Sequence, residues 1–392
     1  MKKAHLLRCA RSPRSNVLRM YVFARPFLAR LASETFLTGL CEFLLTLVFA
    51  LGTACPLASA QTLDQLIASA RKEPELTFIA GAGAFGGPKA IADLEAGVNK
   101  KFGLNARIRF SAGPEMNAMA ARVITELKSG AKASTDIYHG SQSHFSLLHQ
   151  EKALEQVNWA GVFPWISKPM EIFPNEGVLV FTSLRGILYN SNLVPKEKAP
   201  KSYEDLVDSR LSPIWAGKLA IPPYVSWLVE LSMIWSEEKV KNFTRKLVAL
   251  SGGRLRYGEE ERIVSGEFPI AANMGGAVEE MWKWQVKGAP LVAVIGSTPV
   301  LPSYFQLGVP KNSAHPNLAK LFVAFVASKD GQAILEKHES VSSHLVEGTK
   351  MAKYLRDTKL ALQPPKDSIA FYLKGEDSGL QLKEEITKML KQ

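Results

Sequence analysis

The first candidate for chemistry is a glycine-rich segment, Gly81-Ala-Gly83-Ala-Phe-Gly86, which has the G-x-G-x-x-G spacing of dinucleotide-binding loops. In those loops the third glycine lies inside a helix, and an acidic residue ends the next strand to bind the ribose. Here Gly87-Pro88 places the helix start after the third glycine, and the next strand-like run ends at Phe110-Ser111 without an acid. The segment therefore does not indicate a nucleotide, and no cofactor is expected.

Three histidines at five-residue spacing, His139, His144 and His149, are the second candidate. Residues five apart on a helix point about 140° away from each other, so one helix cannot direct all three at one metal ion. No cysteine or acidic residue accompanies them at the spacing of a zinc site. We therefore expect no metal site, although His139 and His144 border a strand-to-helix loop and could contact a ligand.

Nucleophilic catalysis has little support in this chain. The sequence has no G-x-S-x-G elbow, and residues 61–392 have no cysteine, which excludes a thiol mechanism in that part. An acid–base enzyme needs paired titratable groups, and the loops considered below offer only His139 and His144. The sequence favours a binding protein that is not an enzyme, and an enzyme on the same scaffold is the competing hypothesis.

Loops of small or polar residues follow five predicted strands, and each precedes a helix. These loops span residues 81–87, 111–115, 139–145, 222–227 and 273–277. Open α/β sheets bind ligands at the carboxyl ends of their strands, where helix N-termini present free N–H groups. Glycine, serine and asparagine can also simply cap helices. Five such loops in one chain nevertheless favour a cleft that binds a small polar or anionic solute.

Alternating strands and helices must position these loops. Strands are predicted over 76–80, 106–110, 136–139, 178–183 and 186–190, and helices over 63–72, 89–102, 115–128 and 317–327. A second alternating block covers residues 200–290. Strand, turn and helix repeat three times within about 75 residues, which predicts βαβ units and a parallel sheet. Two α/β lobes without a long linker are therefore expected.

The composition changes near residue 60. The 392 residues carry a formal net charge of +11, which would ordinarily suggest nucleic acid or a lipid surface as partner. Eight basic residues and all three cysteines lie in residues 1–60, so residues 61–392 hold 40 basic against 35 acidic residues. A basic stretch, the apolar run 43–51 and the small residues Ala58 and Ala60 predict a cleaved secretory signal. A lipoprotein site at Cys55 and a retained anchor are the alternatives.

Six short motifs follow one another along the second half of the chain. They are Ile187-Leu-Tyr-Asn190-Ser-Asn-Leu-Val194, Ala199-Pro-Lys-Ser-Tyr-Glu-Asp-Leu206, Ile214-Trp-Ala-Gly-Lys-Leu-Ala-Ile-Pro222, Ile263-Val-Ser-Gly-Glu-Phe-Pro-Ile270, Val309-Pro-Lys-Asn-Ser-Ala-His-Pro-Asn-Leu-Ala-Lys-Leu-Phe322 and Ser328-Lys-Asp-Gly-Gln332. In order and spacing they resemble periplasmic solute-binding proteins of ABC importers, in the type II branch that includes ferric-ion binders. The resemblance covers most of residues 75–335.

The resemblance implies an α/β fold of two lobes, each a mainly parallel sheet flanked by helices, joined by crossover hinge strands that close on a ligand. By analogy, 1–60 is the signal peptide, 61–180 the first part of lobe one, 181–295 lobe two with the hinge strands, and 296–392 the return to lobe one with the C-terminal helices. The expected ligand-binding residues are Phe85, Gly86, Ser111, Ser141, His144, Tyr224, Trp227, Asn273, Met274, Gly275 and Tyr304.

The ligand class is narrowed by a departure from the family pattern. Ferric binders of this branch use adjacent tyrosines in lobe two, whereas Tyr224 is followed here by Val225. Carboxylates that would hold a polyamine are also scarce in the five loops. The resemblance thus implies a monomeric periplasmic protein that delivers an organic or oxyanion-bearing solute to an ABC permease in the inner membrane, with no nucleic-acid partner. Ferric iron is the alternative ligand.

Overall fold

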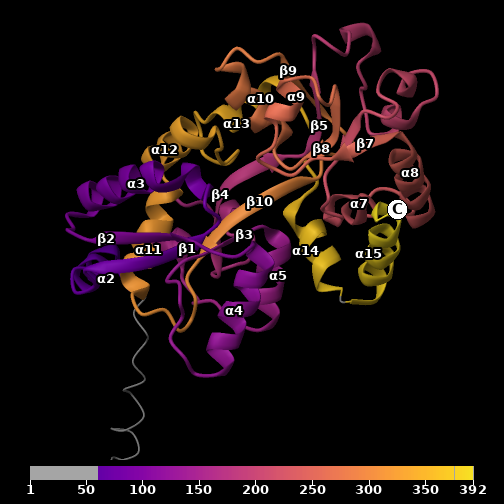
Figure 1. Ribbon diagram of the computed structural model, residues 1–392. Coiled ribbons are helices and arrows are strands. Elements are labelled where there is room, and N and C mark those ends of the chain that lie inside the picture. The colour runs from indigo at the N-terminus through magenta and orange to yellow at the C-terminus, as the bar shows by residue number, and fades with distance from the viewer. Residues whose placement is uncertain (1–60, 375, 392) are drawn as a thin grey trace, which may run out of the picture. The chain divides into compact units, whose positions relative to one another are not determined.

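The computed structural model describes residues 61–374 and 376–391, so the predicted signal segment 1–60 lies outside the described residues. Gln61–Gln392 forms a single compact unit of the chain. None of its described helices combines the length and the apolar character that a membrane span requires. Two groups of strands, each covered by helices, organise this unit (Figure 1).

The first group of strands contains a parallel pair and an antiparallel triplet. Its strands are β1 (Glu75–Ala80), β2 (Arg107–Ala112), β3 (Tyr138–Gly140), β4 (Gly177–Leu184) and β10 (Pro302–Gly308). β1 and β2 pair in parallel, as a βαβ unit requires, and a bridge from Phe78 to Ile137 links this pair to β3. β10 lies antiparallel between β3 and β4, so a late segment of the chain completes the sheet.

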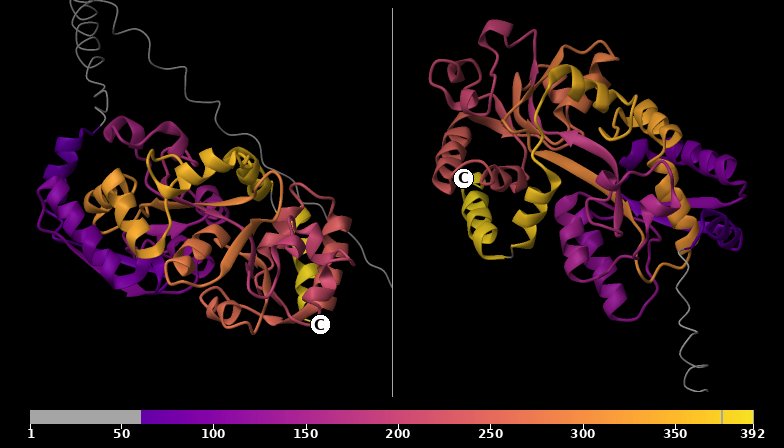
Figure 2. Two further views of the ribbon diagram at one scale, coloured as in Figure 1. Left: turned by 90° about the horizontal axis from the view of Figure 1, so that it is seen from above. Right: turned by 180° about the vertical axis from the view of Figure 1, so that it is seen from behind.

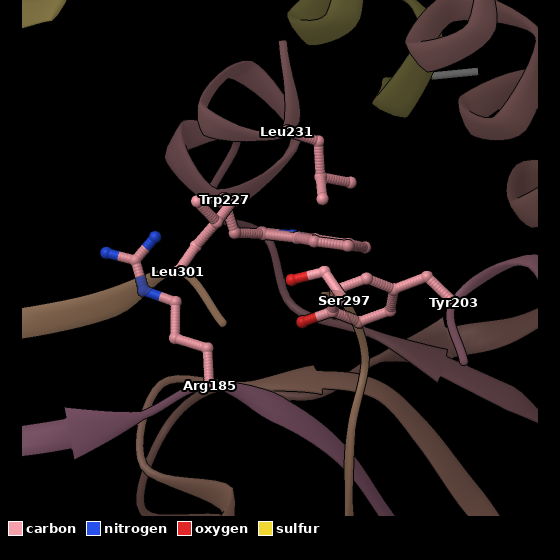
Figure 3. Close-up of a pocket in the computed structure, with 6 residues that line it drawn as sticks. All are labelled: Arg185, Tyr203, Trp227, Leu231, Ser297 and Leu301. Atoms are coloured by element: carbon pink, nitrogen blue, oxygen red, sulfur yellow. The ribbon is translucent and has the colours of Figure 1, made fainter. Parts of the chain in front are cut away.

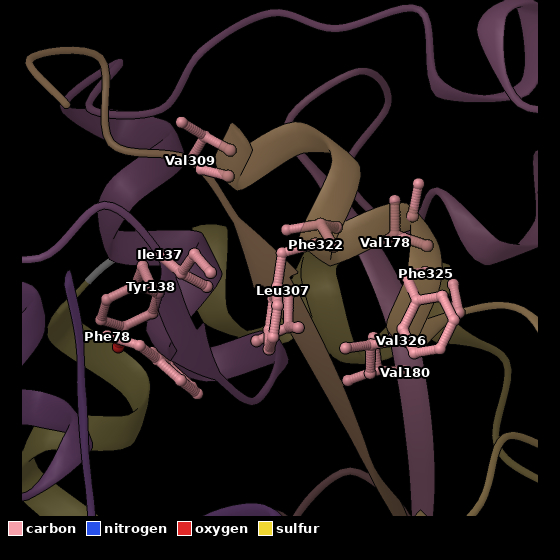
Figure 4. Packing of buried hydrophobic residues seen from close by; sticks show 14 of the residues in the cluster. Phe78, Ile137, Tyr138, Val178, Val180, Leu307, Val309, Phe322, Phe325 and Val326 are labelled. Atoms are coloured by element: carbon pink, nitrogen blue, oxygen red, sulfur yellow. The ribbon is translucent and has the colours of Figure 1, made fainter. Parts of the chain in front are cut away.

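Helices with apolar stripes cover these strands. They are α2 (Leu63–Ala70), α3 (Gly87–Phe102), α4 (Met116–Lys128), α5 (Gln142–Gln150), α6 (Trp159–Val162), α11 (Pro316–Val326) and α12 (Lys329–Glu339). α11 is almost wholly buried because Phe322 packs on Phe78 of β1, whereas Phe325 lies against Gly97 of α3 and the helix also contacts α2. Together these residues form the first hydrophobic cluster, which includes Phe78 and Tyr138 (Figure 4).

The second sheet has five strands in the order β7-β6-β8-β5-β9. Their bounds are β5 (Gly186–Asn190), β6 (Leu219–Ile221), β7 (Ser251–Arg254), β8 (Ile270–Met274) and β9 (Leu291–Ile295), and the helices are α7 (Ser226–Leu231), α8 (Glu237–Leu250), α9 (Glu261–Val264) and α10 (Ala277–Gln285). β6 runs parallel to β7 and β8, whereas β5 runs antiparallel to β8 and β9. A second hydrophobic cluster, including Trp215, Leu247 and Ile270, fills one face.

Strands of the two groups follow each other directly along the chain at two places. Arg185 alone separates β4 from β5, and residues 296–301 connect β9 to β10. The strands at the second crossover pair antiparallel with those at the first, β10 with β4 and β9 with β5, so each group of strands combines parallel and antiparallel pairs. Short 3-10 turns at Ala84–Gly86, Lys168–Met170, Lys196–Lys198, Glu204–Val207 and Ser212–Ile214 complete the connections. Within the alternating block 200–290, the residues after Tyr203 form only the turn Glu204–Val207.

Three helices follow α12. They are α13 (Lys350–Thr358), α14 (Pro365–Leu373) and α15 (Glu376–Leu390). α15 packs against α7 and α8, and its Leu382 and Ile386 are buried in the second cluster. Both views of Figure 2 show α15, in yellow, beside the helices of residues 226–250. Apolar residues at 382, 386 and 390 form a stripe with helical spacing, which explains this burial.

Candidate functional site

The conformation of the loop after β1 is determined mainly by the packing of its side chains in the core. Phe85 is fully buried, and its ring centroid lies 4.8 Å from that of His139. Gly86 has a φ of +87°, and a Cβ built on it would lie 2.5 Å from the Cβ of His338. This position therefore requires glycine for both its left-handed backbone and the close approach of α12. Phe85 belongs to the first cluster, so its ring is part of the core and does not offer a surface to a solute.

The loop after β3 ends in a capped helix. The hydroxyl of Ser141 lies 2.9 Å from Nδ1 of His144, and the backbone N–H of Ser141 donates to the same nitrogen at 3.1 Å. Burial, together with the positive charge of Arg185, lowers the pKa of His144 to about 4. The imidazole is therefore neutral at pH 7. Ser111, at the end of β2, is exposed and has no comparable partner among the described residues.

Tyr224 and Trp227 lie on either side of the start of α7. The Tyr224 ring packs on that of Tyr257, with 4.7 Å between centroids, and Tyr257 is 44% exposed. Trp227 is only 3% exposed and packs beside Tyr203, with 5.3 Å between ring centroids. Its indole Nε1 is buried and has no acceptor among the described residues. A buried N–H without an acceptor is costly, which makes this donor a candidate for binding solute.

Asn273 is the most informative residue of the loop after β8. Its Oδ1 accepts a hydrogen bond of 2.6 Å from the Tyr203 hydroxyl, whereas its buried Nδ2 has no acceptor among the described residues. The next residue, Met274, is buried in a hydrophobic cluster. A Cβ on Gly275 would lie 3.2 Å from the Tyr257 ring, so this glycine allows the tyrosine to approach the strand end. Only Asn273 of the three offers a polar side chain to a solute.

The contacts of Tyr304 hold parts of the fold together. Its side chain is 1% exposed, its hydroxyl donates to the carbonyl of Gln363 at 2.8 Å, and its backbone N–H donates to Oε1 of Gln142 at 2.8 Å. Because its hydroxyl and its backbone are both engaged in this way, Tyr304 fixes the C-terminal segment to β10. The structure thus gives Tyr304 a connecting role between α5, β10 and the residues before α14.

Arg185 is the central charged residue that the sequence reasoning missed. Its side chain is 13% exposed and forms an ion pair with Glu230 of α7, whose side chain is 4% exposed. Nε of Arg185 donates to the Ser303 hydroxyl at 2.9 Å. Glu230 also accepts a hydrogen bond from the hydroxyl of Tyr372 on α14. In the sequence, only the position of a charged residue between two apolar strands indicated a special role for Arg185. Its partners could not be recognised because they are distant in sequence.

A small pocket forms around this arginine. It is lined by Arg185, Tyr203, Trp227, Leu231, Ser297 and Leu301, and it holds about 10 Å³ of free space, roughly one water. Figure 3 shows the hydroxyls of Tyr203 and Ser297 directed toward the side of the pocket where Arg185 lies, with the Trp227 ring above them. The guanidinium and the indole N–H are donors without an acceptor function, so this part of the lining can donate hydrogen bonds to an oxygen atom.

The described residues contain no cluster of three or more histidine, cysteine, aspartate or glutamate side chains able to hold a metal ion. Phenolates are a separate class of iron ligand, and Tyr224 and Tyr257, whose rings pack in a tilted arrangement, follow the neighbouring strands β6 and β7. The absence of adjacent tyrosines in the sequence is therefore offset by a pair that forms in space. Burial raises the pKa of Tyr224, which works against its phenolate form.

Comparisons with known proteins bear on the fold that carries these residues. Residues 263–338 match the family described as bacterial extracellular solute-binding protein. No protein of curated function matches the chain. Among solved structures, iron-bound HitA from Pseudomonas aeruginosa has a TM-score of 0.63 at 17% identity, covering 80% of this chain and 99% of its own. The substrate-binding protein of an Agrobacterium tumefaciens ABC transporter has a TM-score of 0.63 at 17% identity, covering 82% and 97%.

A third solved structure is AfuA from Actinobacillus pleuropneumoniae with fructose-6-phosphate bound. It has a TM-score of 0.61 at 18% identity and covers 81% of this chain and 98% of its own. The chain therefore has the α/β fold of periplasmic binding proteins, and the fold class inferred from the sequence is confirmed. The resemblance to extracellular solute-binding proteins is also confirmed, through the fold and the matched segment 263–338.

Proposed function

We propose that this protein is the solute-binding component of an ABC import system, and that it captures a small oxyanion-bearing solute beside Arg185. One observation carries the proposal: a buried guanidinium adjoins a pocket in which the indole N–H of Trp227 has no acceptor. The nearby amide of Asn273 offers a second unused donor. Buried donors of this kind are stabilised when a ligand oxygen accepts from them.

The predicted domain division provides the motion that such capture needs. We infer that residues 61–180 and part of 296–392 form lobe one, that 181–295 form lobe two, and that the crossovers at Arg185 and 296–301 are the hinges. Free space for about one water leaves no room for an organic solute, so the cleft must widen to admit it. Hinged lobes achieve this with small backbone changes at the crossovers.

The ligand-contacting set is proposed to include Ser141, His144, Tyr224, Trp227 and Asn273 from the loops, joined by Arg185, Tyr203 and Ser297. Ser111 and the backbones of Gly86 and Gly275 can contribute from the rim. Phe85, Met274 and Tyr304 support the site from the core instead. The neutral His144 adds a hydrogen-bonding group without a charge.

A thermal-shift screen of residues 61–392 tests the proposal. Candidate solutes are carboxylates, phosphonates and sugar phosphates, and a solute at 100 times its Kd raises the free energy of unfolding by about 2.7 kcal/mol. Arg185→Lys keeps the charge beside Glu230 but loses the bidentate fork, so we expect at least about tenfold weaker binding. Arg210→Lys, in an exposed pair with Asp208, is the matched control and should bind normally. Failure of every solute class, metals included, would contradict the proposal.

Ferric iron is the second candidate cargo because the ring centroids of Tyr224 and Tyr257 lie 4.7 Å apart. Titration of residues 61–392 with ferric citrate should then produce a visible phenolate-to-iron absorption band. Tyr257→Phe should abolish the band, whereas Tyr354→Phe, far along the chain on α13, should leave it unchanged. A colourless titration removes iron from consideration.

We also propose that residues 1–60 direct export to the periplasm, where the chain meets its permease as a monomer. Mass spectrometry of the exported protein identifies the mature N-terminus. Gln61 as the first residue supports release into the periplasm, whereas an acylated Cys55 supports a membrane-tethered form.

A further inference from the structure

Strands β4 and β10 carry an aromatic pair two residues beyond the contact with Arg185. Ser303 of β10, which accepts a hydrogen bond from Nε of Arg185 at 2.9 Å, is followed two residues later by Phe305. In the antiparallel ladder Ser303 lies opposite Ser183, and Phe305 lies opposite Phe181. Alternate residues of a strand share a face, so both rings lie on the face that Arg185 contacts, about 7 Å farther along the strands.

The opposite face of the same two strands is engaged elsewhere in the fold. There the Thr182 hydroxyl lies 2.6 Å from Nδ1 of His344, and the Tyr304 hydroxyl donates to the carbonyl of Gln363 at 2.8 Å. Thr182 and Tyr304 lie opposite each other, between the serine pair and the phenylalanine pair, so their side chains occupy the other face. The face with Phe305 is thus the one that continues the candidate site.

His139 of β3 extends the phenylalanine pair to three rings. The ring centroid of Phe305 lies 4.5 Å from that of Phe181 and 5.5 Å from that of His139, with 23° and 28° between the ring planes, so both rings stack on Phe305. Phe181 and His139 are buried, whereas Phe305 is partly exposed. We call these three residues the aromatic floor. Phe305 is the member that can contact a solute with its ring.

The aromatic floor is uncharged but retains an unused polar atom. His139 is 8% exposed, and its Nε2 is buried without a hydrogen-bond partner among the described residues. Burial, together with the nearby His144, lowers the pKa of His139 to about 3, so the imidazole is neutral at pH 7. A buried nitrogen without a partner is costly, and a polar atom of a bound solute would relieve that cost. An uncharged ring with a polar substituent or a heteroatom matches these properties.

We propose that the solute carries an aromatic ring, which packs on Phe305 of the aromatic floor while the oxyanion of the solute binds Arg185. Ring pairs prefer offset-stacked or edge-to-face contacts, and a partly exposed phenyl ring can offer either. A substituent or heteroatom of the solute ring is the group that Nε2 of His139 can bind. The inference rests on the proposed function for the oxyanion at Arg185, and it narrows the solute to aromatic carboxylates, phosphonates or phosphate esters.

Two phosphonates that differ in the ring test the proposal. Phenylphosphonate and cyclohexylphosphonate share the same charged group, but only phenylphosphonate has an aromatic ring. Burial of apolar area alone does not favour the phenyl compound. Ring pairs gain stability beyond area burial, so in calorimetric titrations of residues 61–392 we expect phenylphosphonate to bind about two- to tenfold more tightly.

Phe305→Leu removes the ring and keeps an apolar side chain, so the two phosphonates should then bind with equal Kd. Phe305→Tyr retains an aromatic ring and should retain the preference, which keeps the proposal testable if the leucine variant does not fold. Phe110→Leu is the matched control, because Phe110 is also a partly exposed strand residue that packs against the first cluster. The control should keep the preference for phenylphosphonate.

Equal Kd values for the two phosphonates in the parent protein would overturn the aromatic floor, and so would a preference that survives in Phe305→Leu. Binding of sugar phosphates or other oxyanions without an aromatic ring, and of no aromatic one, would also overturn it while the proposed function stands. Failure of every oxyanion, aromatic or not, would refute the proposed function and the aromatic floor with it. The two failures are therefore distinguishable.

Discussion

Replacing Glu230 by leucine should destabilise the protein strongly, because it leaves the Arg185 guanidinium buried without its counter-ion. The two side chains are 13% and 4% exposed, so neither is rehydrated without local unfolding. Breaking a buried ion pair by removing one partner costs about 3–5 kcal/mol. The Tyr372 hydroxyl loses its acceptor at the same time, which adds about 1 kcal/mol. The expected loss in the free energy of unfolding is therefore about 4–6 kcal/mol.

The remaining Arg185 charge is the main cause of this loss, so the double variant Arg185→Met, Glu230→Leu should recover most of it. The coupling between the two positions is then at least about 2 kcal/mol. Urea unfolding of the variants of residues 61–392, followed by tryptophan fluorescence, measures it. Glu204→Leu is the control, because Glu204 pairs with Lys239 at 2.7 Å with both side chains nearly half exposed, and should cost less than about 1 kcal/mol.

A Glu230 variant no less stable than the Glu204 variant would refute the reasoning. So would a coupling below about 0.5 kcal/mol, the level at which distant sites are independent. Either result would mean that the Arg185 guanidinium is hydrated, so that it would not act as a desolvated charged group beside the pocket.

Three further predictions concern pH and backbone strain. Burial lowers the pKa of His144 to about 4, so below pH 6.5 the folded protein binds fewer protons than the unfolded chain. The free energy of unfolding should therefore fall as the pH is lowered toward 4. In urea titrations, His144→Gln should reduce that fall by about 2–3 kcal/mol. Burial raises the pKa of Glu279 to about 8, which reverses the sign: stability should fall as pH rises from 4.5 through 8, and Glu279→Gln should remove this slope. Gly86→Ala should lower the free energy of unfolding by more than the about 1–3 kcal/mol that a left-handed backbone costs, because its Cβ would also clash with His338. Gly103→Ala, at a φ of +62° with its nearest neighbour at 3.8 Å, should cost only the backbone strain. Equal losses of unfolding free energy in urea would contradict this reasoning.

Local patterns sufficed for most of the fold. The predicted strands 76–80 and 186–190 correspond to β1 and β5, and the predicted helix 317–327 corresponds to α11. Each owes its form to periodic apolar residues whose burial the local sequence already specifies. The crossovers were anticipated through the family resemblance. The antiparallel place of β10 between β3 and β4 depends on pairing across more than a hundred residues, which no local pattern records.

The candidate site was predictable only in part. Residues at strand ends, such as Asn273 and Tyr224, were predicted because their position follows from the α/β topology. Whether such a residue faces solvent or core depends on its neighbours, so Phe85 and Met274 were included although they are buried. Arg185 and Tyr372 were missed because their partner Glu230 lies in a different element, distant from both in sequence. For Arg185, the only indication in the sequence was a charged residue between two apolar strands.

A crystal structure of residues 61–392, exported and purified without unfolding so that it keeps its natural solute, tests the central claim most directly. The account predicts a small solute between the lobes, with an oxyanion oxygen about 2.7–2.9 Å from a guanidinium nitrogen of Arg185 and a further oxygen accepting from the Trp227 indole. A solute that occupies the cleft without any polar contact to Arg185, or that binds elsewhere on the protein, would contradict it.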